Sequence, residues 1–395
     1  MLPAGLDSYT TDWLGLLGRW LHVVAAIAWI GTSFYYIALD LHLLPPRRPD
    51  VEDGVGGEVW EIHGGGFYRV EKYRVAPKEL PEPLHWFKWE AYTTWLSGFF
   101  LFVVLYYASA SSTLVDRSVA DVAPWLAVVL SCSLLLAAWV IYDGLCLWLE
   151  RNDRALAVLL AIGIVGAAYG TSHLFAPRAA YLQVGAMIGT IMAANVLFVI
   201  IPGQRELVRA KREGRDPDPS YGIKGKQRSV HNNYLTLPVV FAMLSGHFPV
   251  TYGHSFSWAV LVAMMAIGAW IRHAFNLHHR GVPLRGLWAI PVTAAAAIAA
   301  VAVWLRPAST PPATAGSVTA GKAVFRSAGC ASCHTLRDAG ATGTVGPNLD
   351  RAKPSRELVL ERVTNGLGVM PSFRGRLSSA QIEAVAAYVS HVSGR

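Results

Sequence analysis

Eight long apolar segments recur along the chain, and they constrain its fold more than any other feature. Each approaches or exceeds the ~20 residues that an α-helix needs to cross a bilayer. The 395-residue chain is 53% hydrophobic, 15% charged and has a mean hydropathy of +0.36, values typical of a polytopic membrane protein. The sequence predicts transmembrane helices over 14–44, 84–108, 124–149, 155–175, 180–202, 231–247, 254–276 and 286–305.

Lys and Arg residues concentrate in alternate connections between these segments. The first, third, fifth and seventh connections carry 18 of them, whereas the intervening loops carry only Arg117 and Arg178. Because positive charge marks cytoplasmic loops, both chain ends are expected in the periplasm, with the helices in a bacterial inner membrane. The net charge of +8 then reflects topology and a lipid bilayer as partner, and no nucleic-acid partner is expected.

A haem-attachment signature lies near the C-terminal end. The segment GCASCHTL contains Cys330, Cys333 and His334 in the C-x-x-C-H spacing, in which two thioethers hold haem c and the histidine ligates iron. Met370, in GVMPSF, is expected to be the second axial ligand; the alternative is a methionine that only packs in a core. Covalent haem attachment in bacteria occurs outside the cytoplasm, in agreement with the charge pattern.

Composition divides the chain into three parts. Residues 306–317 are rich in Pro, Ala, Ser and Thr and predict a stiff linker. Residues 1–305 then form the membrane domain, and 318–395 have the length of one small all-α class I cytochrome c domain. The fold class is therefore all-α, a bundle of about eight transmembrane helices followed by a cytochrome.

Short similarities suggest that the bundle is duplicated. LHVVAAI at 21–27 is similar to LQVGAMI at 182–188, and AAWVIYD at 137–143 is similar to GAWIRHA at 268–274. The paired segments occupy corresponding places in the two halves, which predicts a 4+4 repeat.

Histidines occur in an outer and an inner tier of the membrane segments, where polar groups are expensive and usually functional. They predict one or two b-type haems beside the haem c. His22 is the favoured outer ligand, with His173 or His247 as its partner, and His85, His231 and His273 are candidates for an inner haem. The competing interpretation is interfacial histidines in contact with lipid headgroups, which is preferred for His254, His278 and His279.

The first long connection has an unusual sequence, EIHGGGFYRVEKYRVAPKELPEPLHWFKWEAY. Glycines after His63 allow a backbone to approach a ligand closely. FYRVEKYRV alternates as a short strand would, although a solvated hairpin without a ligand remains the alternative. Lys88 and Tyr92 lie one helical turn apart, and Lys88 has the alternative role of a positive-inside anchor.

Several long strings resemble one known family. HGGGFY, HWFKWEAYTTWLSG, RAAYLQVGAMIGTIMAANVLFVIIPGQ and HNNYLTLPVVFAMLSGHFP, followed by a haem c tail, resemble the integral-membrane, cytochrome-c-fused urate oxidases of bacteria. This resemblance implies oxidation of urate and water to 5-hydroxyisourate. It also implies electron transfer to a periplasmic cytochrome c or terminal oxidase of the respiratory chain, without hydrogen peroxide.

Other functions remain open at this point. One alternative is a non-enzymatic conduit from quinol to cytochrome. Another is a haem-metabolism enzyme, because RWLHVVAAIAWIG resembles the first helix of the membrane protoporphyrinogen oxidases, which bind haem b, and of the copper-resistance membrane proteins.

The residues near the inner connection suit a planar purine anion, which needs aromatic walls, hydrogen-bond partners and a proton acceptor. The catalytic candidates are Lys88, Glu90, His85 and Thr93. The substrate-binding candidates are His63, Gly65, Tyr68, Trp89, Tyr92, Asn232 and Asn233, the last two because amides can both donate to and accept from a purine edge.

Overall fold

The computed structural model describes most of the chain. The described residues are 8–46, 51, 54–117, 119–150, 152–253, 256–305, 317–343, 346–367, 370 and 372–393. The predicted linker, apart from Ser317, and His254 lie outside them.

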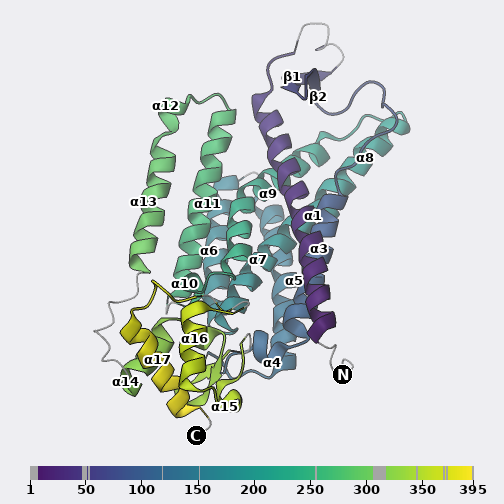
Figure 1. Ribbon diagram of the computed structural model, residues 1–395. Helices are drawn as coiled ribbons and strands as arrows, with labels where there is room; N and C mark the ends of the chain where they lie inside the picture. The colour runs from purple at the N-terminus through teal and green to yellow at the C-terminus, as the bar shows by residue number, and fades with distance from the viewer. Residues whose placement is uncertain are drawn as a thin grey trace.

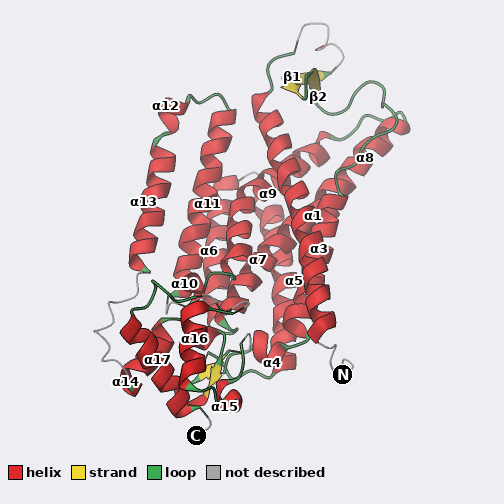
Figure 2. Cartoon of the chain, viewed as in Figure 1, coloured by secondary structure: helices red, strands yellow, loops and turns green. Residues whose placement is uncertain are grey.

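Long helices form a bundle with a smaller helical domain at one end (Figures 1 and 2). The long helices of the bundle are α1 (Ser8–His42), α3 (Trp89–Phe102), α5 (Pro124–Leu149), α6 (Asp153–Ser172), α7 (Pro177–Ala194), α8 (Ile201–Arg212), α9 (Pro219–Ser245), α11 (Ser257–His279) and α13 (Ala289–Trp304). The shorter elements are the π-helices Val103–Tyr107 and Asn195–Ile200 and the helices α4 (Ala110–Thr113), α10 (Pro249–Tyr252) and α12 (Leu284–Leu287).

Local sequence determines where several helices begin. Proline occupies the first turn of α5, α7 and α9, where its missing N–H costs no helical hydrogen bond. Asn152 caps α6 by accepting from the Ala155 amide at 3.1 Å. Asp218 caps α9 in the same way through the Ser220 amide at 2.8 Å.

Five helical runs in the described part of the chain are long and apolar enough to cross a membrane. They are Trp13–His42, Pro124–Leu149, Asp153–Ser172, Pro177–Arg212 and Ser257–His279. The all-α membrane bundle is thus confirmed, whereas a count of eight spans and the 4+4 repeat stay predictions. The remaining predicted segments are helical as well, in α3, α9 and α13.

Two predicted helix starts were wrong. The segment predicted to begin at residue 84 becomes helical only at Trp89, so His85 precedes the helix and Lys88 is its N-cap residue. The segment predicted to begin at 231 starts at Pro219, because the basic stretch before 231 continues the same helix. Apolar patterning marks the part of a helix that meets lipid and does not detect such a polar extension.

The predicted strand is present. β1 (Val55–His63) pairs antiparallel with β2 (Gly66–Tyr73), and His63 lies opposite Gly66 at the turn. The Tyr35 hydroxyl of α1 donates to Glu61 of β1 at 2.6 Å, and Lys72 of β2 forms an ion pair with Asp40 of α1. These contacts attach the hairpin to the end of α1.

The two ends of the bundle differ in what they carry. Figure 1 shows β1, β2 and α12 at one end, which we call the hairpin end. The start of α1, together with α4, α10 and the C-terminal domain, lies at the other, which we call the cytochrome end. The start of α1 and the C-terminal domain therefore share one end, in agreement with the charge pattern.

The C-terminal domain packs around its own core. Its helices are α14 (Val318–Ser327), α15 (Leu349–Ala352), α16 (Arg356–Asn365) and α17 (Ser379–Val392), and two short strands are β3 (Thr335–Leu336) and β4 (Ala341–Thr342). Ser378 caps α17 within a capping box with Gln381. The first and last long helices cross where a Cβ on Gly321 would lie 2.1 Å from the Ala384 carbonyl oxygen, so this position requires glycine.

Candidate functional site

Three buried polar side chains meet between α9 and α11 in the hairpin half of the bundle. Asn233 on α9 is fully buried, and Arg272 and Asn276 on α11 are each 3% exposed. Arg272 Nε and Asn276 Nδ2 donate to the same oxygen, Asn233 Oδ1, at 2.9 and 3.0 Å. Because both partners of that oxygen are donors, the orientations of the two amides are determined. We call these three residues the polar trio.

A close approach of two helices brings the polar trio together. A Cβ on Gly268 of α11 would lie 3.1 Å from Leu237 Cβ and 3.3 Å from the Pro238 nitrogen of α9. One turn nearer the hairpin end, Arg272 therefore faces Asn233. Phe34 of α1 closes the third side, with the Arg272 guanidinium carbon 3.9 Å from the centre of its ring.

Each member of the polar trio keeps one buried polar atom without a hydrogen-bond partner. These atoms are Asn233 Nδ2, Arg272 Nη2 and Asn276 Oδ1. Leaving a buried polar group unpaired costs about 1–3 kcal/mol, and more when the group is charged. Three such atoms in one place mark a site that is incomplete without another molecule.

A second buried network lies on the opposite face of α9, and its hydrogen bonds connect α5, the π-helical turn at Asn195 and α9. His231 Nδ1 is 2.8 Å from the Tyr142 hydroxyl, and Asn195 Nδ2 donates to that hydroxyl at 3.2 Å. Arg228 donates to Asn195 Oδ1 at 3.3 Å and to Asp143 at 2.6 Å.

The substrate candidate Asn232 belongs to this satisfied network. Its Oδ1 accepts from Asn195 at 2.8 Å, and its Nδ2 donates to the Met192 carbonyl at 3.0 Å. The two adjacent candidates on α9 therefore point to different neighbours: Asn232 reaches α7, whereas Asn233 reaches α11.

The predicted catalytic residues lie at the start of α3. The Lys88 ammonium is 5.7 Å from the centre of the Trp89 ring, and the ring of Trp89 packs edge-on against Tyr92 at 5.9 Å. Glu90 is half-buried, and its Oε2 is a buried atom without a hydrogen-bond partner. His85 is exposed and precedes the helix.

Thr93 and the hairpin residues occupy different surroundings. The Thr93 carbonyl accepts from the Ser97 hydroxyl at 2.6 Å within α3. His63, Gly65 and Tyr68 lie at the exposed tip of the β1–β2 hairpin, which extends beyond the helix ends in Figure 1. The structure does not bring these hairpin residues together with Asn233.

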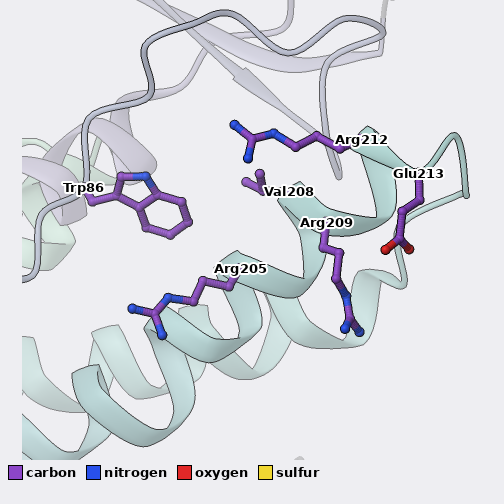
Figure 3. A pocket seen from close by; sticks show the side chains of 6 residues that line it. All are labelled: Trp86, Arg205, Val208, Arg209, Arg212 and Glu213. Atoms are coloured by element: carbon purple, nitrogen blue, oxygen red, sulfur yellow. The ribbon is translucent and has the colours of Figure 1, made fainter.

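A basic surface pocket opens beside α8. Figure 3 shows Trp86 opposite the arginines of α8, around a cavity of about 370 Å³. Two of these arginines already have carboxylate partners: Arg209 pairs with Glu206, and Arg212 donates to Glu82 at 2.9 Å. The pocket is thus a rival anion site with largely neutralised charge.

The outer histidines lie on separate helices. His22 Nδ1 is 3.0 Å from the Thr94 carbonyl of α3, and donation to that carbonyl leaves Nε2 free as an acceptor, as an iron ligand requires. His173 bonds to the Tyr169 carbonyl of its own helix at 2.8 Å, and His247 is exposed at the end of α9. None of the contacts of the described residues joins two of these imidazoles, and the haem b ligands stay predictions.

Two of the three candidates for an inner haem, His231 and His273, bond to tyrosine hydroxyls. His231 bonds to Tyr142, as described above, and His273 Nδ1 is 2.8 Å from the Tyr234 hydroxyl.

The haem-attachment segment has the groups that haem c requires. Neither Cys330 nor Cys333 forms a disulfide, and burial raises the pKa of the Cys330 thiol to about 12. His334 Nδ1 bonds to the Pro347 carbonyl at 2.9 Å, which leaves Nε2 for iron. A Cβ on Gly346 would lie 2.5 Å from the His334 ring, so only glycine allows this imidazole position. Met370 packs, partly buried, against the domain core.

The family model described as urate oxidase N-terminal matches residues 8–306. The chain belongs to this family. A second model, cytochrome c oxidase cbb3-type subunit III, matches residues 316–389.

The relatives of this urate oxidase family member match its C-terminal part. Cytochrome c6 of Picosynechococcus sp. is 44% identical over 91 residues, covering 20% of this chain and 76% of that protein. Cytochrome c6 of Microcystis aeruginosa is 44% identical over 73 residues, 18% of this chain and 89% of that protein. The c-type cytochrome SorU from Sinorhizobium meliloti is 51% identical over 20% of this chain and 92% of its own, with a TM-score of 0.19. The sequence relatives confirm a cytochrome c domain and therefore a covalent haem c.

Sequence reasoning found Asn233 but missed its partners in this urate oxidase family member. Arg272, Asn276 and Phe34 were not among the candidates. Arg272 did carry a signal, because it is a lone charge inside the apolar segment SWAVLVAMMAIGAWIRHAFN, and such charges are usually functional. Phe34 carries no comparable signal among the many aromatic residues of the helices.

Proposed function

We propose that this chain is a membrane urate oxidase linked to cytochrome c. Urate and water give 5-hydroxyisourate, two protons and two electrons, and the electrons leave through haem c to the respiratory chain rather than to dioxygen. The observation that carries this proposal is the union, in one chain, of a urate oxidase N-terminal domain and a cytochrome c domain that contains the C-x-x-C-H segment.

The C-terminal domain would hold haem c as the electron acceptor. Cys330 and Cys333 would hold the porphyrin, and His334 and Met370 would ligate its iron. Haem c, when bound, supplies a one-electron acceptor.

The proposed setting is the bacterial inner membrane. The hairpin end would lie in the cytoplasm and the cytochrome end in the periplasm, where a soluble cytochrome c or a terminal oxidase would accept the electrons. Support comes from the basic connections at the hairpin end and from the shared position of the start of α1 and the cytochrome domain.

A b-type haem inside the bundle is a separate part of the proposal. The hydrocarbon core of ~30 Å is too thick for one direct electron transfer between a site at the hairpin end and haem c. His22, with its free Nε2, is the favoured ligand. A pyridine haemochrome spectrum decides the matter: a b-type signal beside the c-type signal supports the relay, and a c-type signal alone contradicts it.

The decisive experiment adds urate to the purified, fully oxidised protein without oxygen. We expect reduction of haem c, followed by its absorbance, with formation of 5-hydroxyisourate, and no reduction with quinol alone. Reduction by quinol but not by urate would instead establish the electron-conduit function. Activity on a porphyrinogen would establish the haem-metabolism function.

The start of α3 is the proposed proton-transfer region. Glu90→Gln, Lys88→Met and His85→Ala should each lower the rate of urate-dependent haem reduction by at least about 100-fold, the lower end of the contribution of a positioned proton-transfer group. Lys78→Met is the matched control, a basic residue of the same connection. Rates equal to the control in all three variants would place proton transfer elsewhere.

A further inference from the structure

The strongest unassigned feature of the molecule is the polar trio beneath Phe34. Each of its three orphaned atoms lies two covalent bonds from an atom that takes part in the hydrogen bonds to Asn233 Oδ1. The orphans therefore crowd around one small volume. They comprise two donors, Asn233 Nδ2 and Arg272 Nη2, and one acceptor, Asn276 Oδ1.

The charge in this volume is not compensated by the protein. Among the described residues, no carboxylate forms an ion pair with Arg272, although its side chain is 3% exposed and lies in a membrane-spanning helix. A buried cation without a partner is strongly unfavourable. Arg228, the other deeply buried arginine of this half, has Asp143 at 2.6 Å. Within the part of the chain that the structure describes, Arg272 thus lacks an anionic partner, which a bound anion would supply.

The pattern of donors and acceptor restricts what that anion is. A halide or a fully deprotonated oxyanion would satisfy the two donors but could not donate to Asn276 Oδ1. A planar anionic heterocycle with neighbouring carbonyl and N–H groups satisfies all three. The Arg272 guanidinium carbon lies 3.9 Å from the centre of the Phe34 ring, and this contact restricts the directions of its forked donors.

We propose that the polar trio is the binding site for the urate anion. Arg272 Nη2 and Asn233 Nδ2 donate to its oxygens or deprotonated nitrogen, and Asn276 Oδ1 accepts from one of its N–H groups. This proposal rests on the proposed function and deepens it, because it assigns the residues that recognise the substrate.

A pair of histidines lies at the hairpin end of the polar trio. His42 on α1 lies two turns beyond Phe34 and His279 on α11 two turns beyond Arg272, with a ring nitrogen of each 3.5 Å apart. His279 follows Asn276 by three residues and so shares its helix face. These two rings therefore connect α1 and α11 beside the proposed site.

The test measures urate binding, apart from turnover, on the full-length haem-loaded protein in detergent. Titration calorimetry with urate should show that Arg272→Gln weakens binding by at least about 30-fold, since it removes one partner of a buried charged pair. Hypoxanthine, an uncharged purine, should bind the wild type far more weakly than urate. Arg205→Gln, in the rival pocket of Figure 3, is the matched control and should bind urate as the wild type does.

A thermal melt separates recognition from folding. Without urate, Arg272→Gln should melt at the wild-type temperature or above it, because a buried unpaired charge is removed. The rise in melting temperature that urate produces in the wild type should be absent in this variant. A variant that melts lower but still binds urate tightly would assign Arg272 a structural role and overturn the inference.

The outcomes distinguish this inference from the proposed function. If the wild type binds urate and reduces haem c while Arg272→Gln binds equally well, the inference fails and the function stands. Loss of binding in Arg205→Gln alone moves the site to the surface pocket. If the wild type neither binds urate nor reduces haem c with it, the proposed function itself fails.

Discussion

Two buried arginines in the hairpin half of the bundle have opposite surroundings. Arg228 on α9 bonds to Asp143 and Asn195, and its neighbours Tyr142, His231 and Asn232 are linked in the same network. Arg272 on α11 stacks on Phe34 and bonds to Asn233, but the trio retains three unpaired atoms. Both clusters use α9, through adjacent asparagines that face different helices.

This contrast distinguishes a polar network that connects helices from one that binds a ligand. Hydrogen bonds in the Arg228 network connect α5, α7 and α9 without any further molecule, so a structural role is enough to account for this network. The polar trio is equally buried and connected, yet its unpaired charge makes the empty state unfavourable. A bound anion would convert that cost into affinity.

The largest expected effect concerns the Arg228 network. Arg228→Gln leaves Asp143 without its partner and should lower the free energy of unfolding by about 3 kcal/mol, the lower part of the range for a broken buried pair, because Asp143 is 30% exposed. Thermal unfolding in detergent without urate measures it. Arg272→Gln is the matched control, expected to lose nothing. Equal destabilisation of both variants would abolish the contrast between the two clusters.

Replacement of the whole ion pair sharpens the comparison. Arg228→Met combined with Asp143→Leu removes both charges and should recover about 2 kcal/mol of the loss, since apolar residues of similar volume often replace a buried pair without penalty. The same melting assay gives the result. A double variant no more stable than Arg228→Gln would show that the arginine acts mainly through Asn195 and the Tyr142 ring.

A single hydroxyl tests whether the Arg228 network is structural only. Tyr142→Phe removes the bonds to His231 and Asn195 and should cost about 1 kcal/mol of stability. Urate affinity should stay unchanged, as measured by calorimetry. If affinity falls while stability is retained, the ligand would belong to the Arg228 network instead.

The smallest effect is expected at Phe34. Phe34→Leu keeps an apolar side chain but removes the aromatic face beneath Arg272, a contact worth about 0.5–2 kcal/mol. Urate affinity should fall severalfold, while melting without urate changes little. Phe275, 5.9 Å from the same guanidinium carbon, provides the matched control as Phe275→Leu. A larger loss of affinity in that control would mean that the more distant ring positions the arginine.

The cytochrome site and the polar trio differ in how far the sequence predicts them. Cys330, Cys333 and His334 are almost contiguous, and a short segment with one required spacing presents them to the same haem. Such a site is predictable because the local chain alone brings its groups together. The cytochrome family model that matches residues 316–389 confirms the domain, and the individual haem ligands stay predictions.

The helices were predictable for a related reason. Inside a membrane the backbone of a long apolar segment must be hydrogen-bonded within the protein. A single segment of about 20 residues satisfies this requirement as an α-helix. The two errors concern helix ends, where this constraint no longer applies. Residues 84–88 precede the helix α3, which begins at Trp89, and α9 already begins at Pro219, in a polar stretch.

The sequence alone was enough to predict the all-α bundle, the cytochrome domain and the family of this protein. The packing of the helices was needed to show that Asn233, and not Asn232, contacts Arg272 and Asn276 beneath Phe34. Phe34, Asn233 and Arg272 are far apart in the chain, and the contact of Asn233 with Arg272 depends on the close approach of α9 and α11 at Gly268. Hydrophobic patterning predicts which residues are buried but not which helix faces contact each other. The contacts between faces depend on how the shapes of the side chains fit together.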